Sequence, residues 1–251
     1  MEKKEKRGKT GNGMALIVPI VLVFCILGGF VFYVAGRTSK EMSASAVDNL
    51  TESLDLIRGT IEAILKREAD FQKLIAREIE AMEDPEGFIR SYNRNETMVK
   101  LSLVPAGETE GISNTGQAFS TEDLDFSAGK MVDGLPVSES YLNHMGAWAY
   151  TIQCPIVKEG RETAALYIEY IYESFDKALP NRFYNGNASL YVMDAENERL
   201  VLKPKGMGER EAGHVNLEDF YRANQILEED VKKEVTECVK AGKNVMFYHD
   251  I

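Results

Sequence analysis

The sequence is poor in the residues that build disulfide-linked or metal-stabilised folds. Its 251 residues include three cysteines and three histidines. Three cysteines, at Cys25, Cys154 and Cys238, are too few for a disulfide scaffold or a four-ligand zinc site. The sequence also has no phosphate-binding glycine loop, no nucleophile elbow and no HExxH motif. We therefore expect this chain to have no metal, no cofactor and no catalytic residues.

Positive charge is also scarce. The chain carries 29 Lys and Arg residues against 40 Asp and Glu residues, a formal net charge of -11. Nucleic-acid binding needs a basic surface that neutralises phosphates, so this charge argues against nucleic acid as a partner. Hydrophobic residues make up 44% of the chain, enough for the core of one large domain or two small ones.

One long segment, residues 14–35 (MALIVPIVLVFCILGGFVFYVA), has no charged side chain. A helix over these residues would be roughly 33 Å long, close to the ~30 Å hydrocarbon core of a bilayer. Residues 1–13 carry a local charge of +3, and the positive-inside rule places them in the cytoplasm as a basic tip. We expect a single-pass transmembrane helix in the plasma membrane, with residues 36–251 extracytoplasmic. The alternative is a cleavable signal peptide, whose apolar region is usually shorter.

The next segment, residues 36–84, predicts an unusually long stalk helix. Between Arg37 and Asp84 there is no proline and one glycine, Gly59. Side chains spaced alternately by three and four residues form a stripe that is mostly apolar. This stripe predicts either a parallel homodimer seam or packing on the chain's own sheets, and its two glutamates weaken the coiled-coil alternative. Its members are Val47, Leu50, Leu54, Ile57, Ile61, Ile64, Glu68, Phe71, Ile75, Glu78 and Met82.

After Asp84 the hydrophobic period changes from helical to alternating, and turn residues become frequent. We expect an α+β fold made of PAS-like antiparallel-sheet modules. In the first module the predicted elements are strands at Met98–Val104, Ala147–Ile156 and Thr163–Tyr172, a hairpin turn at residues 158–161, and a short helical turn at Glu173–Leu179.

A second module is predicted after residue 180. Its expected elements are a hairpin of Ser189–Asp194 with Arg199–Leu202, helices at Leu217–Ala223 and Glu228–Ala241, and a strand at Asn244–Tyr248. A sheet that stops after about three strands leaves an unpaired edge, which native proteins avoid. We therefore expect the second module to be truncated and the sequence to be the N-terminal part of a longer protein.

The order of these parts resembles the double Cache (dCache) extracytoplasmic sensors of bacterial signalling proteins. Three segments carry the resemblance: Cys154-Pro155-Ile156-Val157 with its hairpin turn, AALYIEYIYESFDKAL at Ala164–Leu179, and SLYVMDAENERLVL at Ser189–Leu202. The resemblance implies a membrane-distal module at residues 85–180 and a membrane-proximal module at residues 181–251.

The resemblance also implies a function, the ligand-sensing input region of a signal-transduction receptor. Its output domain, absent from this chain, would be a histidine kinase, with a diguanylate cyclase as the alternative. A membrane-anchored binding protein without an output domain is a further alternative, and the reading frame beyond residue 251 would distinguish them.

Family members that bind amines or amino acids carry an acidic residue in the returning strand, and Glu169 matches that position. A ligand ammonium group would compensate a buried carboxylate there. Aromatic side chains at Trp148, Tyr150, Tyr167 and Tyr141 would then wall a small-molecule site and add cation–π attraction.

Two further points bear on this ligand site. One alternative is that Trp148 and Tyr150 are core residues under the stalk and that Glu169 is solvated. In addition, the family's amino-acid binders have an arginine with a Trp-Tyr pair ahead of the hairpin, and Phe119–Tyr141 contains no such pattern. The expected ligand is therefore a small cation and not an amino acid.

Overall fold

The computed structural model describes residues 11–93, 98–179, 190–202, 216–243 and 245. The chain divides into two compact units, Met1–Leu56 and Ile57–Ile251. Most of the predicted basic tip, the start of the predicted strand Ser189–Asp194 and nearly all of Asn244–Tyr248 lie outside the described residues.

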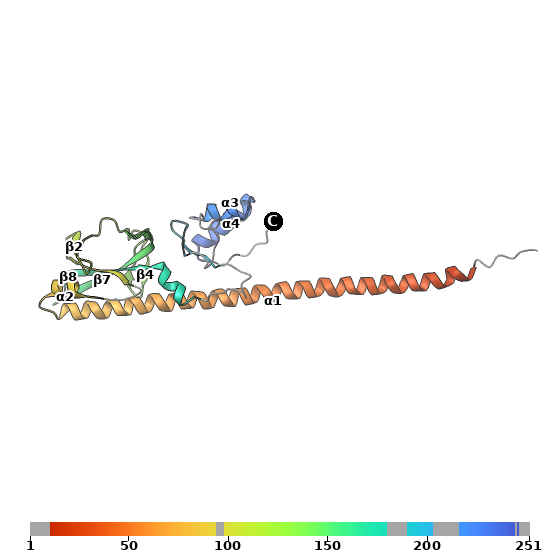
Figure 1. Cartoon of the computed structure of the whole chain (residues 1–251), viewed down its shortest axis with the longest axis horizontal. Helices are drawn as coiled ribbons and strands as arrows, with labels where there is room; N and C mark the ends of the chain where they lie inside the picture. The colour runs from red at the N-terminus through yellow and green to blue at the C-terminus, as the bar shows by residue number, and fades with distance from the viewer. Residues whose placement is uncertain (1–10, 94–97, 180–189, 203–215, 244, 246–251) are drawn as a thin grey trace, which may run out of the picture. The chain divides into compact units, whose positions relative to one another are not determined.

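One continuous helix, α1, runs from Gly11 to Glu80 (Figure 1). It includes nearly all of the predicted stalk, and it ends four residues before the N-cap of helix α2 (Pro85–Ser91). The Asp84 carboxylate caps α2 by accepting a hydrogen bond from the Gly87 amide at 2.9 Å. Pro85 suits the first turn of α2 because proline has no amide hydrogen and residues in that turn need none for the helix.

The backbone of residues 14–35 is helical within α1, and most side chains of this segment lie outside the described residues. Among the described residues, no helix combines the length and the hydropathy of a membrane span.

The second unit is built on a six-stranded antiparallel sheet in the order β3-β2-β1-β8-β7-β6. Strands β7 (Trp148–Lys158) and β8 (Arg161–Ile171) form the predicted hairpin, and Glu159 and Gly160 make its turn with positive φ angles of 53° and 76°. The three predicted strands of the first module are confirmed to within two residues. The other strands are β1 (Met98–Pro105), β2 (Glu110–Ser113), β3 (Ala118–Ser120), β6 (Tyr141–Leu142) and a separate pair, β4 (Met131–Val132) with β5 (Leu135–Pro136).

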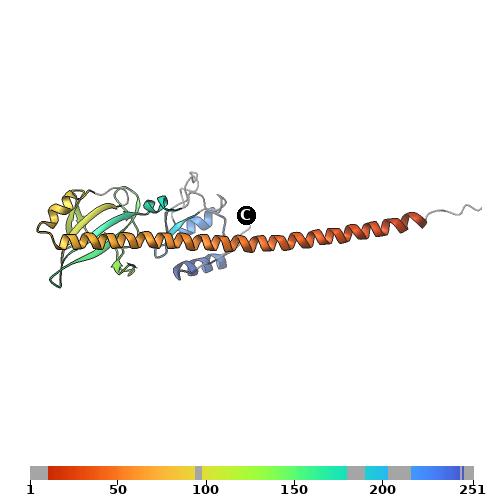
Figure 2. The ribbon, with the colours of Figure 1, turned by 90° about the horizontal axis from the view of Figure 1, so that it is seen from below.

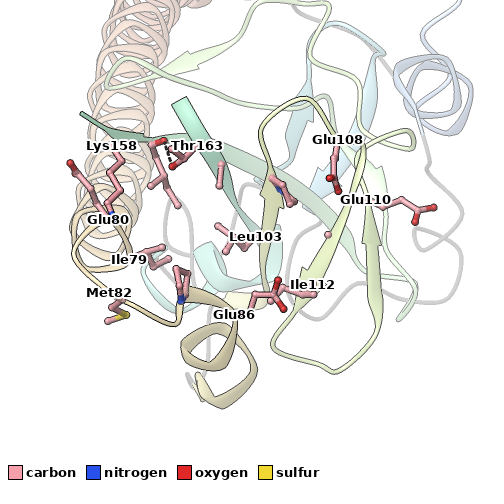
Figure 3. Close-up of a pocket in the computed structure, with 15 residues that line it drawn as sticks. Ile79, Glu80, Met82, Glu86, Leu103, Glu108, Glu110, Ile112, Lys158 and Thr163 are labelled. Atoms are coloured by element: carbon pink, nitrogen blue, oxygen red, sulfur yellow. Dashed lines mark hydrogen bonds between the residues drawn. The ribbon is translucent and has the colours of Figure 1, made fainter. Parts of the chain in front are cut away.

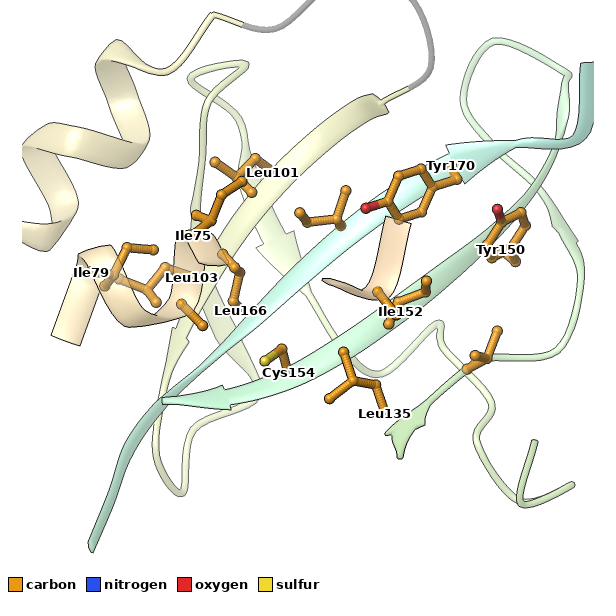
Figure 4. Packing of buried hydrophobic residues seen from close by; sticks show 14 of the residues in the cluster. Ile75, Ile79, Leu101, Leu103, Leu135, Tyr150, Ile152, Cys154, Leu166 and Tyr170 are labelled. Atoms are coloured by element: carbon orange, nitrogen blue, oxygen red, sulfur yellow. The ribbon is translucent and has the colours of Figure 1, made fainter. Parts of the chain in front are cut away.

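The C-terminal part of α1 lies along one face of this sheet (Figures 1 and 2). Side chains alternate between the faces of a strand, so every second residue of β7 and β8 points toward α1. These side chains and those of Ile75 and Ile79 form the main hydrophobic core (Figure 4). The stripe from Ile57 to Ile75 therefore lies in the chain's own core, which was one of its two predicted roles. Glu78, the next predicted member, is exposed, and Ile79 is buried in its place.

Two polar side chains are buried between α1 and the sheet. Gln72 donates hydrogen bonds from Nε2 to the carbonyls of Ile152 (2.8 Å) and Leu166 (2.9 Å) and so ties α1 to both central strands. Glu68, which interrupts the apolar stripe, is buried here and accepts a hydrogen bond from Arg67 at 3.0 Å.

The chain continues through a 3-10 helix, η1 (Tyr172–Lys177), into the predicted second module. Strands β9 (Val192–Asp194) and β10 (Arg199–Leu202) form a hairpin. Helices α3 (Leu217–Ala223) and α4 (Glu229–Lys240) share a small core of Leu217, Tyr221, Ile226 and Val235. The predicted short helical turn, the hairpin and both helices of this part are confirmed.

Candidate functional site

The candidate site is a buried polar cluster around Glu169, on the sheet face that points away from α1. Glu169 lies in β8 directly opposite Thr151 of β7, and the next residue along β8, Tyr170, belongs to the core on the α1 face. The Glu169 residue is only 6% exposed. The solvated alternative for this carboxylate is therefore excluded.

A phenol bonds one oxygen of this carboxylate. The Tyr141 hydroxyl donates to Glu169 Oε2 at 3.0 Å and lies 2.7 Å from the Thr151 hydroxyl. A phenol has one proton to donate, so the Thr151 hydroxyl is the donor in the second hydrogen bond. Burial, followed by the nearby carboxylate, raises the pKa of Tyr141, which keeps the phenol protonated at neutral pH.

An amide bonds the other oxygen. Asn143 Nδ2 donates to Glu169 Oε1 at 2.9 Å. The orientation of this amide is fixed by the turn between β6 and β7, because Asn143 Oδ1 accepts from the backbone amides of Met145 and Ala147, both at 3.0 Å. The tight β6–β7 turn thus presents a donor to the carboxylate of a neighbouring strand.

The carboxylate has no described counter-ion. Within the ranges that the structure describes, no Lys, Arg or His lies within salt-bridge distance of Glu169. Its cross-strand neighbour in β1 is Lys100, whose Nζ instead lies 5.1 Å from the centroid of the Phe119 ring. A carboxylate offers about four lone pairs, and the protein donors described above use two. The remaining capacity suits a cationic donor that comes from outside the chain.

Tyr167 lies on the same face of β8 as Glu169, two residues before it. Its ring packs against Phe119, with ring centroids 5.3 Å apart, and against Phe126 at 6.4 Å. The opposing residue in β1 is Ser102, whose buried hydroxyl has no hydrogen-bond partner among the described residues. This face therefore combines aromatic surface with unused hydrogen-bonding capacity.

The structure does not bring the other two predicted wall residues to this face. Tyr150 is 2% exposed in the core on the α1 face, where its ring stacks on Tyr170 with centroids 5.5 Å apart. Trp148 is half-buried and its ring faces the Arg199 guanidinium at 5.6 Å. Successive side chains of a strand point to opposite faces of the sheet. Trp148 and Tyr150 of β7 therefore point to the other face from Thr151, which pairs with Glu169.

Asn143 and Thr151 are site residues that were not predicted. Thr151 could have been found from the hairpin register, which sets it opposite Glu169 once the turn at residues 158–161 is known. Asn143 had no comparable signal, because it acts through a short turn whose shape depends on β6 pairing with β7.

A second buried carboxylate, Asp194, contacts the residue that precedes Tyr141. Asp194 of β9 accepts hydrogen bonds from Lys130 Nζ (2.7 Å), from the Ser140 backbone amide (3.1 Å) and from the Ser140 hydroxyl. Ser140 immediately precedes Tyr141, the donor to Glu169. One short segment therefore contacts both the candidate site and the predicted second module.

The described structure also contains a pocket of about 530 Å³, but it is formed by other residues (Figure 3). It lies at the end of the sheet near Glu80 and Leu103, and none of the five predicted site residues lines it. In the part of the chain that the structure describes, no three His, Cys, Asp or Glu side chains gather as a metal site.

Comparison with solved structures identifies proteins of similar fold. No protein-family model matches the sequence, and no curated protein matches it. The sensory domain of the Campylobacter jejuni chemoreceptor Tlp3 with isoleucine bound aligns over 65% of this chain and 73% of its own length, at 14% identity and a TM-score of 0.50. The ligand-binding domain of the Pseudomonas aeruginosa amino-acid chemoreceptor PctC in complex with GABA aligns over 68% and 80%, at 16% identity and a TM-score of 0.50.

The extracellular domain of the putative histidine kinase mmHK1S-Z3 also aligns, over 73% of this chain and 76% of its own length, at 14% identity and a TM-score of 0.49. At these identities the likeness concerns the fold alone. The chain has the α+β fold of ligand-binding sensory domains.

Proposed function

We propose that this chain is the extracytoplasmic ligand-sensing region of a membrane receptor, and that it binds a small cationic ligand through Glu169. The observation that carries the proposal is a carboxylate only 6% exposed, bonded by two neutral donors and without a described counter-ion. A buried charge in that condition is costly unless a cation compensates it. The fold shared with chemoreceptor sensory domains supports a ligand-binding role for the chain.

The ligand class follows from what surrounds the carboxylate. An ammonium group can donate to the free lone pairs of Glu169, and the rings of Tyr141 and Tyr167 lie on the same side of the sheet and can add cation–π attraction. Phe119–Tyr141 contains no arginine that would hold a ligand carboxylate. We therefore propose an amine without a carboxylate as the ligand.

Signal transmission would use the segment that contacts both carboxylates. A ligand that donates to the free lone pairs of Glu169 shares the carboxylate with Tyr141 and Asn143, and Ser140, the residue before Tyr141, is bonded to Asp194. Binding then shifts β6 and with it the contact between the two predicted modules. Such a ligand acts only if its affinity differs between two arrangements of the protein.

We further propose that the chain is anchored through residues 14–35 and associates as a homodimer through the N-terminal part of the stripe. The Leu54 side chain is apolar and 46% exposed, so it is free to form a contact outside the chain. Cysteines placed at Leu54 should cross-link two copies in membranes, and failure to cross-link would contradict the dimer. The resemblance favours a histidine kinase over a diguanylate cyclase as the output domain.

The binding proposal is tested with the Glu169→Gln variant. Gln keeps the shape and the hydrogen-bonding oxygen but removes the charge, so the fold should persist while binding of an amine is lost. A panel of primary amines and polyamines is screened by thermal shift on the full chain, and each hit is titrated by calorimetry. We expect Glu169→Gln to weaken the binding of every hit by at least about tenfold, because one charge-assisted hydrogen bond is lost.

The matched control is Glu122→Gln, which removes the same charge from an exposed position. This variant should bind the hits as tightly as the unchanged chain. Equal binding by the Glu169→Gln variant, with an unchanged melting temperature, would show that Glu169 is not the ligand-binding group.

A further inference from the structure

The pocket of about 530 Å³ occupies the end of the sheet where the helical cover stops. α1 ends at Glu80 and the chain turns into α2 at Pro85. Ile79 of α1 and Ile89 of α2 belong to one core, so both helices lie on the same side of the sheet. Figure 3 shows the end of α1 on one side of the pocket, α2 below it and the strand ends opposite. The volume lies within the range of roughly 300–1,000 Å³ that is usual for small-molecule sites.

The floor of the pocket is apolar and belongs to the folded core. Leu103 of β1 pairs with Ile112 of β2, and both contact the main hydrophobic core on the α1 face. Ile156 of β7 and Ala164 of β8, which also pair with each other, complete the floor. Ile79 closes one wall from the last turn of α1. A bound apolar group would therefore contact side chains that the fold already holds in place.

The closest packing at the pocket depends on one glycine. A Cβ atom on Gly111 would lie 2.1 Å from the Leu103 carbonyl oxygen, so only glycine permits this approach of β2 to β1. The close approach brings Ile112 and Glu110, which share a face of β2, to the pocket beside Leu103.

The rim of the pocket is acidic. Four glutamates line it, Glu80, Glu86, Glu108 and Glu110, against a single lysine, Lys158. Glu86 lies 3.6 Å from Arg90 of its own helix. The other three glutamates have no ion pair within 4.0 Å among the described residues. An apolar floor under a negatively charged rim complements a molecule that has an apolar body and a positive head.

We propose that this pocket is a second ligand site, separate from Glu169, that binds a small amphipathic organic cation. The apolar body would lie on Leu103, Ile112 and Ile156. The cationic head would lie at the acidic rim, where Glu80 and Glu110 stand on opposite sides of the pocket and both attract it. The site does not depend on the Glu169 proposal, because the two sites share no residue and lie on opposite faces of the sheet.

The test uses three probes with one apolar body and different charge: 1-adamantylmethylammonium, 1-adamantylmethanol and 1-adamantanecarboxylate. Each is titrated by calorimetry into the full chain carrying Glu169→Gln, so that binding at Glu169 cannot contribute. The ammonium should bind most tightly and the carboxylate most weakly. The double variant Glu80→Gln/Glu110→Gln should weaken binding of the ammonium by about three- to tenfold, as expected for the loss of two rim charges. The affinity for the alcohol should stay unchanged.

The matched control is the double variant Glu122→Gln/Glu173→Gln, which removes the same charge from exposed positions outside the pocket. It should leave all three affinities unchanged. A third variant, Ala164→Phe, fills the pocket and should abolish binding of both the ammonium and the alcohol without lowering the melting temperature.

Three results would overturn the proposal. The first is no binding of the ammonium, and the second is equal binding of the ammonium and the carboxylate. The third is a loss of ammonium affinity in the control variant as large as in the rim variant. A change of oligomeric state on Glu80→Gln/Glu110→Gln, measured by sedimentation, would instead assign the pocket to a second copy of the chain. Each of these results leaves the Glu169 proposal to be decided by its own experiment.

Discussion

Asp194 accepts hydrogen bonds from both the backbone amide and the hydroxyl of Ser140, which lies 54 positions earlier in the sequence. The Ser140 hydroxyl also lies 2.7 Å from the Tyr172 hydroxyl, which must be the donor because the serine proton is directed to the carboxylate. Lys130 adds an ion pair at 2.7 Å. This carboxylate thus joins β9 to the β6 segment that carries Tyr141.

Removal of the Asp194 charge should destabilise the fold in a pH-dependent way. Burial opposes ionisation of this carboxyl, but hydrogen bonds from Lys130 and Ser140 outweigh it, so the pKa lies below the ordinary value of 3.8. A lowered pKa in the folded state stabilises the protein above pH 3.8, and the contribution is lost as the pH falls through the folded-state value. Asp194→Asn should therefore lower the free energy of unfolding by about 1–2 kcal/mol at pH 7.

Urea unfolding of the variant and the unchanged chain at several pH values checks this prediction. The two curves should converge in acid, because the unchanged carboxyl is then protonated too. Asp123→Asn, at an exposed position, is the control and should have no comparable effect. If the difference in unfolding free energy between the two proteins stays constant from neutral to acid pH, the destabilisation does not come from the lost Asp194 charge.

Tyr141 and Glu169 should be energetically coupled. Tyr141→Phe removes one of the two described donors to a buried carboxylate, which we expect to cost about 1–3 kcal/mol of unfolding free energy. In the Glu169→Gln background the same change should cost less, because the group left without a donor is neutral. A double-mutant cycle by chemical denaturation should give a coupling of at least about 0.5 kcal/mol, and additive effects would contradict the hydrogen bond.

Two tyrosines of one aromatic cluster should respond oppositely to loss of the hydroxyl. The rings of Tyr150 and Tyr172 lie 5.1 Å apart, but the buried Tyr150 hydroxyl has no described partner while Tyr172 bonds Ser140. Tyr150→Phe should be neutral or stabilising, since it removes an unsatisfied buried polar group, whereas Tyr172→Phe should cost about 1 kcal/mol. Thermal melts of both variants check this prediction. A larger fall in melting temperature for Tyr150→Phe than for Tyr172→Phe would contradict it.

Two glycines should also respond oppositely to alanine. Gly59 lies inside α1 with no atom near the position of a Cβ, so Gly59→Ala should stabilise the protein by about 0.5–1 kcal/mol through lower backbone entropy in the unfolded chain. Gly111→Ala would place a methyl group 2.1 Å from the Leu103 carbonyl and should disrupt the β1–β2 pairing. Hydrogen exchange of the β1 and β2 amides checks the second effect, and unchanged protection there would show that the contact relaxes easily.

Much of the fold could be predicted because its signals are local. The proline-free stretch after Arg37, the alternation in residues 147–172 and the turn at Glu159-Gly160 each specify an element from neighbouring residues. The short strands β2 to β6 were not predicted, because strands of two to four residues are too short to show a period and are fixed by the partner strand.

The sequence by itself determined that an acidic residue stands in the returning strand and that aromatic residues flank it. Only the tertiary structure decided which of these residues meet. Strand alternation and the register of β7 against β8 put Tyr141, Tyr167 and Glu169 on one face and Tyr150 on the other. The pocket at the end of the sheet had no sequence signal, because it forms where α1 ends and two strand pairs that are distant in the chain, β1–β2 and β7–β8, come together.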